Sequence, residues 1–325
     1  WKDPEARSEV LGQLVDKAVE VVETVRPLLG EVRRGMRKKL LKLCRHLMLV
    51  VEQNLTVDED GSWQVIQGVA SGRIISMTDP QARHGHKSSS KKFNGFKLHL
   101  LGDAVSGLIV SLAVTPGSAH DGQPAPRLIK RAKKLCDSMQ LLLGDTAYGG
   151  ARLREQTQRL EGVKIIAPPP RGGEYQGLGK ADFEVDLDKG EATCPNGEVS
   201  DDIAYVSYGS NGRRGPRFLW SKDICRGCPL AEQCKAPQKT GNSRIVFHPN
   251  EATLRELRAE WEQPETQQIY RERTQGERLV NEAVRRGARK AMAWGIESAE
   301  LQAYVIAMVN NLSLLAKRLA AEDDA

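Results

Sequence analysis

Aromatic side chains are scarce in this sequence, since phenylalanine, tryptophan and tyrosine together make up 5% of its 325 residues. Proteins that bind single-stranded nucleic acid stack bases on aromatic side chains, and this composition leaves little material for such a surface. No apolar run approaches the length of a membrane-spanning helix, and no signal peptide opens the chain. We therefore expect a cytoplasmic protein without a membrane partner.

A strong excess of one charge is also missing. The chain has 48 basic and 42 acidic residues, and its net charge of +6 is compatible with a polyanionic partner but too small to establish one. A hydrophobic content of 40% is ordinary for a globular protein. The length predicts one domain with an insertion, or two smaller domains. Because the first residue is Trp1 and not methionine, we expect an N-terminally incomplete piece of a longer chain.

The most informative stretch begins with three consecutive leucines, Leu141–Leu143. This run predicts a short strand buried on both faces, as in a parallel or mixed sheet. Asp145 follows it, and Gly149 and Gly150 then lead into a helical pattern over 151–160. An acidic residue at the carboxyl end of a central strand lies where ligands and metals bind. Aspartate is also a good helix cap, so this stretch alone leaves a cap and a functional site equally open.

The order of strands and helices around this stretch predicts an α/β protein with a mixed sheet. Residues 1–60 have helical periodicity, and residues 168–249 have the glycines, prolines and short alternating segments of an inserted β-rich subdomain. The remaining strands are expected at Trp63–Val69, Arg73–Met77, Phe93–Leu101, Leu108–Val114 and Lys164–Ala167, with a hairpin at 103–107 and a helix at Gly122–Asp137.

Helical patterns return after the insertion, at Glu251–Glu262, Glu265–Ala293 and Ser298–Leu319. The last of these has an apolar stripe at helical spacing, which predicts a helix that packs on the core. The stripe consists of Leu301, Tyr304, Val305, Met308, Val309, Leu312, Leu315 and Leu319.

A polar, basic loop is expected between Asp79 and Lys92. A loop of this kind is suited to contacts with DNA phosphates, although a plain surface loop fits equally well. The candidate contacts are Arg83, Lys87, Lys91 and Lys92. His84 and His86 are weak evidence for a metal site, because no third ligand is nearby. A second basic run, from Arg33 to Arg45, is more typical of a solvated helix face than of a DNA contact.

Four of the six cysteines lie in the insertion, as Cys194, Cys225, Cys228 and Cys234. The Cys-x2-Cys pair places two thiolates on one turn, and two more would complete a tetrahedral Zn²⁺ site. Structural zinc is the favoured interpretation, and free or redox-active cysteines are the alternative. The other two cysteines, Cys44 and Cys136, occur in helical, apolar contexts and are expected to be buried thiols.

Tyr270, Arg273 and Glu277 are spaced by three and four residues, which places them on one face of a continuous helix. An ordinary charged surface has the same appearance. A carboxylate of this kind, together with a strand-end aspartate far upstream, is what a two-metal phosphoryl-transfer site requires.

Several ordered motifs resemble one family, the DDE transposases of bacterial insertion sequences, in a subgroup with a cysteine-containing insertion. The segments that carry the resemblance are Trp1–Arg7, Thr78–Lys97, Gly144–Gly149, the Tyr270-x2-Arg273-x3-Glu277 signature and Asn310–Leu312. In the family signature a lysine follows the glutamate. Here Val284 occupies that position, which leaves the role of the neighbouring Arg285 in doubt.

The resemblance implies a ribonuclease H-like fold in which helices flank the sheet, and metal-dependent cleavage and strand transfer at the ends of an insertion sequence. It implies that Asp145 and Glu277 are catalytic and bind Mg²⁺ or Mn²⁺, with Arg273 orienting Glu277 or touching phosphate and Tyr270 bracing the helix or contacting DNA. The partners would be double-stranded DNA and, as one possible assembly, a second copy in a homodimer. The alternative is a non-catalytic, zinc-dependent DNA-binding or regulatory remnant.

The same resemblance gives the expected domains and one departure. Residues 1–60 would be a helical region, 61–167 the first part of the core, 168–249 the zinc-binding insertion and 250–325 the helices that complete the core. In the family the first catalytic aspartate precedes the helical region, so we expect it to be missing here. Asp79 and Asp103 follow expected strands and are weak candidates to replace it.

Overall fold

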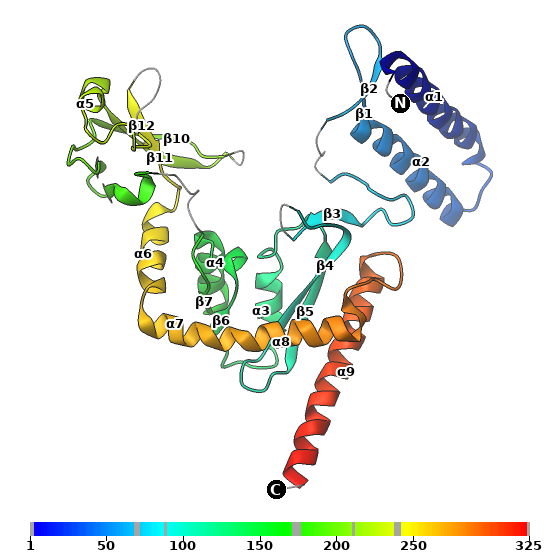
Figure 1. The fold of residues 1–325 in the computed structure, drawn as a ribbon. Helices are drawn as coiled ribbons and strands as arrows, with labels where there is room; N and C mark the ends of the chain where they lie inside the picture. Colours follow the sequence, from blue (N-terminus) through cyan, green and yellow to red (C-terminus); the bar gives the residue numbers. More distant parts are fainter. Residues whose placement is uncertain are drawn as a thin grey trace. The chain divides into compact units, whose positions relative to one another are not determined.

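The computed structural model describes residues 3–67, 72–87, 90–170, 177–209, 212–236 and 242–323 (Figure 1). The chain divides into two compact units, and each is described by itself. Unit 1 comprises Trp1–Pro124 and Gln275–Ala325, and unit 2 comprises Ala125–Thr274. Both units contain helices and strands, so the α/β class predicted from the sequence is confirmed.

Unit 1 begins with the two predicted helices, α1 (Pro4–Leu28) and α2 (Arg34–Asn54). Asp3 caps α1 by accepting a hydrogen bond from Glu5 N at 3.0 Å. The helical region ends earlier than predicted, because β1 (Leu55–Val57) and β2 (Trp63–Val65) form an antiparallel hairpin. The rest of the predicted strand at Trp63–Val69 reaches into residues outside the described part.

The prediction of a strand at Arg73–Met77 is wrong, because this segment has no regular secondary structure. Side chains at the end of α2 bind this segment instead of a neighbouring strand. Gln53 Oε1 accepts a hydrogen bond from Ile74 N at 3.0 Å, and the Arg73 guanidinium donates to Asn54. Side-chain hydrogen bonds of this kind replace the backbone hydrogen bonds that a neighbouring strand would form.

A three-stranded antiparallel sheet forms the centre of unit 1, in the order β3-β4-β5. The strands are β3 (Arg83–His86), β4 (Lys92–Gly102) and β5 (Ile109–Pro116). The predicted β4–β5 hairpin is confirmed, with Leu98 opposite Val114. The basic segment predicted to be a loop instead contains β3, whose His84 pairs with Asn94 of β4.

The last helix, α9 (Ile296–Asp323), packs on β5 through small and branched side chains. Ala303, Ile306, Ala307 and Asn310 are buried. The predicted orientation was wrong, because the larger side chains of the apolar stripe are exposed, for example Leu312 at 58%. Small side chains bring the helix close to the sheet, and that face of α9 is therefore the one in contact with it.

Unit 2 contains the parallel pair β6 (Leu141–Leu143) and β7 (Lys164–Ile166) with helices α3 (Ala125–Lys133) and α4 (Ala151–Glu161). Leu142 is buried, whereas Leu141 is exposed, so the prediction that β6 is buried on both faces holds only in part. Buried Arg154 of α4 donates to Ile165 O at 2.9 Å and thereby holds α4 to β7; burial lowers the pKa of its guanidinium.

The insertion has the predicted β-rich character. A two-stranded sheet of β8 (Glu184–Asp186) and β9 (Glu191–Thr193) accompanies a three-stranded antiparallel sheet of β10 (Asp202–Ser207), β11 (Arg214–Trp220) and β12 (Ser243–Val246). Short helix α5 (Lys222–Arg226) follows β11. The hydrophobic core of the insertion contains four aromatic side chains, Phe183, Phe218, Trp220 and Phe247. These are four of the 16 phenylalanine, tryptophan and tyrosine residues of the chain.

The helix predicted at Glu251–Glu262 is α6 (Glu251–Trp261). The single long helix predicted at Glu265–Ala293 is instead a series of shorter elements. These are α7 (Pro264–Tyr270), a 3₁₀ turn at Arg271–Arg273, α8 (Thr274–Ala283) and a π-helical segment at Val284–Ala288. Helical geometry is broken at Gly287, whose φ is 97°. A backbone at this φ favours glycine, and it ends the run before α9 begins.

Candidate functional site

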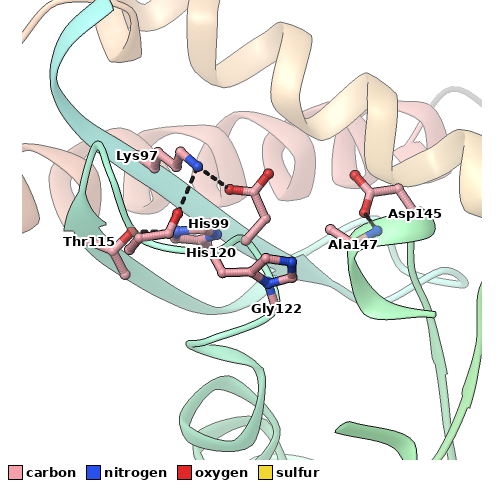
Figure 2. Close-up of polar contacts among 9 residues, drawn as sticks. Lys97, His99, Thr115, His120, Gly122, Asp145 and Ala147 are labelled. Atoms are coloured by element: carbon pink, nitrogen blue, oxygen red, sulfur yellow. Dashed lines mark hydrogen bonds and ion pairs between the residues drawn. The ribbon is translucent and has the colours of Figure 1, made fainter. Parts of the chain in front are cut away.

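Asp145 lies directly after the β6–β7 pair, where Gly144 N still donates to Ile166 O at 3.0 Å. Its Oδ1 accepts a hydrogen bond from Ala147 N at 2.9 Å and caps the 3₁₀ turn Thr146–Tyr148 (Figure 2). The side chain is exposed. Within the described residues Oδ2 has no hydrogen-bond partner, so one oxygen caps the turn while the other can bind a ligand.

Of the two glycines that follow the turn, Gly149 has a packing role, whereas Gly150 has open space around it. A Cβ on Gly149 would lie 2.0 Å from the backbone oxygen of Pro168, which excludes any side chain at this position. The chain therefore passes close to the segment after β7 before α4 begins at Ala151. This close approach fixes the turn that contains Asp145.

Glu277 lies in the first turn of α8, in unit 1, and its side chain is exposed. Two residues later, Leu279 is buried against Ile109, Leu112 and Val114 of β5. The packing of Leu279 anchors α8 to the sheet and leaves Glu277 on an exposed part of the helix. Asp145 belongs to unit 2 and Glu277 to unit 1, so the position of each is described relative to its own unit.

Tyr270 and Arg273 are brought together in unit 2. The Arg273 guanidinium lies 5.9 Å from the centroid of the Tyr270 ring, and Trp261 packs edge-on against the same ring at 4.7 Å. The 3₁₀ turn between α7 and α8 changes the residue spacing, so the single helical face predicted for Tyr270, Arg273 and Glu277 is not a continuous α-helical face. Arg285 forms an exposed ion pair with Glu282 at 2.9 Å.

The predicted basic residues differ in their environment. Arg83 is half-buried and donates to Pro80 O at 2.6 Å and Ala82 O at 2.8 Å, so its guanidinium stabilises the turn before β3. Lys87, Lys91 and Lys92 are exposed and line a cavity of about 690 Å³ in unit 1. Arg289 and Lys290, which are not among the predicted contacts, line the same cavity together with exposed Met292 and Trp294.

Neither candidate for the missing aspartate has the character of a metal ligand. Asp79 is buried, and its two oxygens accept from Gln81 N and Gly295 N. Asp103 accepts from Ser106 N at 2.6 Å, and hydrogen bonds from Ser106 lower the pKa of its carboxyl group. Both carboxylates are therefore used to stabilise backbone turns.

A polar cluster in unit 1 was missed by the sequence reasoning. Lys97 of β4 donates to Ala119 O and to Asp121 Oδ1, both at 2.7 Å (Figure 2). His99, on the same face of β4, is buried and contacts Thr115 Oγ1 at 2.8 Å. The signal was present, since Lys97 and His99 alternate with apolar residues, but that alternation equally predicts a solvated face.

The four cysteines of the insertion converge. Cys194, Cys225, Cys228 and Cys234 line one small cavity of about 20 Å³. Burial raises the pKa of the Cys225 and Cys234 thiols, and the neighbouring thiols raise it further. None of the six cysteines, all of which lie in described residues, forms a disulfide. Cys136 is exposed and Cys44 half-buried, so the prediction that both are buried is wrong.

The described residues contain neither a ready-formed metal site nor a membrane-spanning helix. No group of three or more histidine, cysteine, aspartate or glutamate side chains is arranged, as it stands, to hold a metal ion. In the same part of the chain, no helix combines the length and apolar character needed to cross a bilayer.

Comparison with known proteins gave one match. The model of a family described as "Transposase DDE domain" matches residues 63–312, which is more than half of the chain and includes both Asp145 and Glu277. No curated protein and no solved structure matches the chain.

Proposed function

Because the chain belongs to the transposase DDE domain family, we propose that it acts on DNA in metal-dependent cleavage and strand transfer at the ends of an insertion sequence. The observation that carries this proposal is the exposed carboxylate of Asp145 at the carboxyl end of β6, inside the matched region. Strand ends of this kind in α/β proteins are where ligands bind.

Asp145 and Glu277 are the residues that we propose to bind the metal ions. Both are exposed carboxylates, and Mg²⁺ and Mn²⁺ prefer oxygen ligands of this kind. When bound, a pair of such ions supplies Lewis-acid stabilisation of the charge that develops on the attacking and leaving oxygens. The cap from Ala147 N fixes the orientation of Asp145, and the packing of Leu279 fixes the turn of α8 that contains Glu277.

Tyr270 and Arg273 have a supporting role in this proposal. Arg273 is half-buried and lies over the Tyr270 ring, which itself packs against Trp261. This stack restrains the turn that leads into α8. A guanidinium held in this way is suited to a phosphate contact or to orienting the carboxylate of Glu277.

The exposed cations around the cavity of unit 1 are the proposed DNA contacts. Lys87, Lys91 and Lys92 come from the β3–β4 hairpin, and Arg289 and Lys290 precede α9. Contacts with phosphate bind all sequences alike and weaken as salt is added. Single replacements of Lys92 or Lys290 with glutamine should therefore weaken binding to every duplex and reduce the salt dependence by about one phosphate contact each.

We extend the proposal to the fold and assembly. The sequence predicted one mixed sheet, but each sheet in the described residues is purely parallel or purely antiparallel, with β6–β7 and β3-β4-β5 in separate sheets. The ribonuclease H-like fold is therefore a proposal that rests on the family. The domain boundaries at residues 167 and 249 remain part of this proposal, whereas the boundary at residue 60 would divide the β1–β2 hairpin. A homodimer is supported by the exposed apolar side chains of α9, since association would bury them.

The direct test is a nicking assay on duplexes that contain the element's own terminal repeats, with Mg²⁺ or Mn²⁺. Asp145→Asn and Glu277→Gln should each reduce the rate by about 100-fold or more, because a lost metal ligand removes several kcal/mol of transition-state stabilisation. Asp137→Asn and Glu272→Gln, at two other exposed carboxylates, should retain the rate of the unaltered chain. Cleavage that persists in both carboxylate variants would refute the assignment.

A non-catalytic DNA-binding protein with a zinc-stabilised insertion is the second candidate. It is favoured by the cavity that the four cysteines share, and by the use of Asp79 and Asp103 in backbone turns. Salt-dependent DNA binding that survives both carboxylate variants, without metal-dependent nicking by the unaltered chain, would support this candidate over the first.

A further inference from the structure

The four cysteines of the insertion come from three separate turns and face the same small space. Cys194 follows β9, Cys225 lies in α5, Cys228 follows that helix and Cys234 lies in the next turn. Their shared cavity of about 20 Å³ is close to the space that one water molecule requires. A single metal ion is therefore the largest ligand that this space admits without rearrangement.

Backbone groups are directed at two of the sulphur atoms. Leu230 N donates to Cys228 Sγ at 3.4 Å, and Ala236 N donates to Cys234 Sγ at 3.5 Å. In each case the donor lies two residues after the cysteine. A hydrogen bond from an N–H group stabilises the charged thiolate over the neutral thiol, and such bonds surround sulphur atoms that bind metals.

The other two cysteines are held by local turns. Gly197 N donates to Cys194 O, and Cys194 N donates to Glu198 O, both at 2.8 Å. Cys225 begins a second turn, in which Cys228 N donates to Cys225 O at 3.4 Å. These bonds place the Cys-x2-Cys pair on one turn and Cys194 on another, which is the arrangement of two ligand-bearing turns at a structural Zn²⁺ site.

The cysteines lie at the edge of the hydrophobic core of the insertion. Cys194, Cys225 and Cys234 pack against one side of the cluster that contains Phe183 and Trp220. Hydrophobic packing alone is the simpler explanation for three half-buried thiols. It does not account for the fourth cysteine, which lines the same small cavity, or for the N–H groups directed at two of the sulphur atoms.

We propose that Cys194, Cys225, Cys228 and Cys234 bind one Zn²⁺ ion that holds the turns of the insertion together. Four thiolates form a closed tetrahedral site, so this zinc is structural and leaves no position open for a substrate. In the present arrangement the four sulphur atoms surround the cavity without meeting the spacing of a metal site, and binding would draw them inward. The proposal does not depend on Asp145 or Glu277, so it can fail or succeed separately from the transposase function.

The test uses the full chain, produced in zinc-supplemented medium, and measures zinc per chain by elemental mass spectrometry. About one ion per chain is expected. Replacement of zinc by Co²⁺ should give the charge-transfer and visible bands of tetrahedral cobalt thiolate. Chains that are folded by circular dichroism, contain no zinc and give no such bands would overturn the proposal.

Variants identify the ligands. Cys194→Ser and Cys228→Ser should each lose the four-thiolate cobalt spectrum, whereas Cys136→Ser, at an exposed cysteine outside the insertion, should keep both the spectrum and the zinc. If a serine variant does not fold, the cobalt spectrum of the unaltered chain decides the question, since four-thiolate and three-thiolate sites differ in charge-transfer intensity. An unchanged spectrum in folded Cys194→Ser would overturn the four-ligand site, and a disulfide between these cysteines in freshly purified chain would do the same.

Discussion

The Asn311 side chain forms two hydrogen bonds with the backbone of Ile109. Ile109 N donates to Asn311 Oδ1, and Asn311 Nδ2 donates to Ile109 O, both at 2.9 Å. The amide thus satisfies both backbone groups at the first residue of β5, as a neighbouring strand would. This paired contact anchors α9 to the sheet and explains why an asparagine is needed on this face of the helix.

Replacing Asn311 with leucine should lower the free energy of unfolding by about 1–3 kcal/mol, because both backbone groups of Ile109 lose their partner. Urea unfolding followed by circular dichroism measures this change. Asn281→Leu, at an exposed position of α8, is the control and should change stability by no more than about 0.5 kcal/mol. Equal effects of the two substitutions would show that the Asn311 contact is not formed.

The orientation of α9 leads to a second prediction. Ile306 is 7% exposed and Leu312 is 58% exposed, although both belong to the apolar part of the same helix. Ile306→Ala should cost about 2–5 kcal/mol through lost burial and a cavity, whereas Leu312→Ala should cost less than about 0.5 kcal/mol. The same unfolding measurement checks both. A larger loss at Leu312 would restore the orientation predicted from the sequence.

The ion pair between Lys97 and Asp121 gives a third prediction. Only 19% of the Lys97 side chain is exposed, and its ammonium group also satisfies Ala119 O. Lys97→Met should lower the free energy of unfolding by about 1–2 kcal/mol, since the carbonyl and the partly exposed carboxylate both lose a charged donor. Lys17→Met breaks a pair whose lysine is 75% exposed and should have almost no effect. Thermal unfolding of the two variants compares them directly.

His248 makes the stability of unit 2 sensitive to mild acid. Burial lowers the pKa of its imidazole below 6.5, the nearby Arg213 lowers it further, and Nδ1 accepts a hydrogen bond from Asn250 N at 3.0 Å. The unfolded chain therefore takes up a proton at a higher pH than the folded chain. Stability should be full above about pH 6.5 and should fall as the pH decreases from there toward the folded pKa.

Urea unfolding at about pH 7.5 and about pH 5.5 measures this dependence, and the comparison between the unaltered chain and His248→Gln isolates the contribution of this histidine. The variant should lose less stability between the two pH values. An identical loss in both proteins would contradict the prediction and assign the acid sensitivity to other groups.

The local structure around Asp145 could be predicted because its signals are local. The leucine run, Asp145 and the glycines that follow occupy ten consecutive residues, and the structure has the strand, the cap and the turn in that order. The β4–β5 hairpin was also predictable, since each strand alternates and a short turn joins them. The two interpretations of Asp145, a cap and a functional residue, are both compatible with its geometry. One carboxylate oxygen caps the turn, and the other has no hydrogen-bond partner within the described residues.

Other features depend on residues far apart in the sequence. The exposed stripe of α9 has the periodicity of a buried face, and only the packing of Ala303 and Ala307 on the sheet determines which side is buried. The contact of Asn311 with Ile109 joins residues separated by 202 positions. The breaks around Arg271–Arg273 and Gly287 occur inside a run with consistent helical character, so the sequence predicted one long helix.

The most direct test of the central claim is to map the metal-binding residues with Fe²⁺ and ascorbate, which cut the polypeptide close to a bound ion. We predict cuts next to Asp145 and next to Glu277, suppressed by excess Mg²⁺. Asp145→Asn should abolish the cuts near residue 145, Glu277→Gln those near residue 277, and Glu272→Gln neither. Cleavage at other sites, with no cut near either carboxylate, would contradict the assignment of Asp145 and Glu277 as metal ligands.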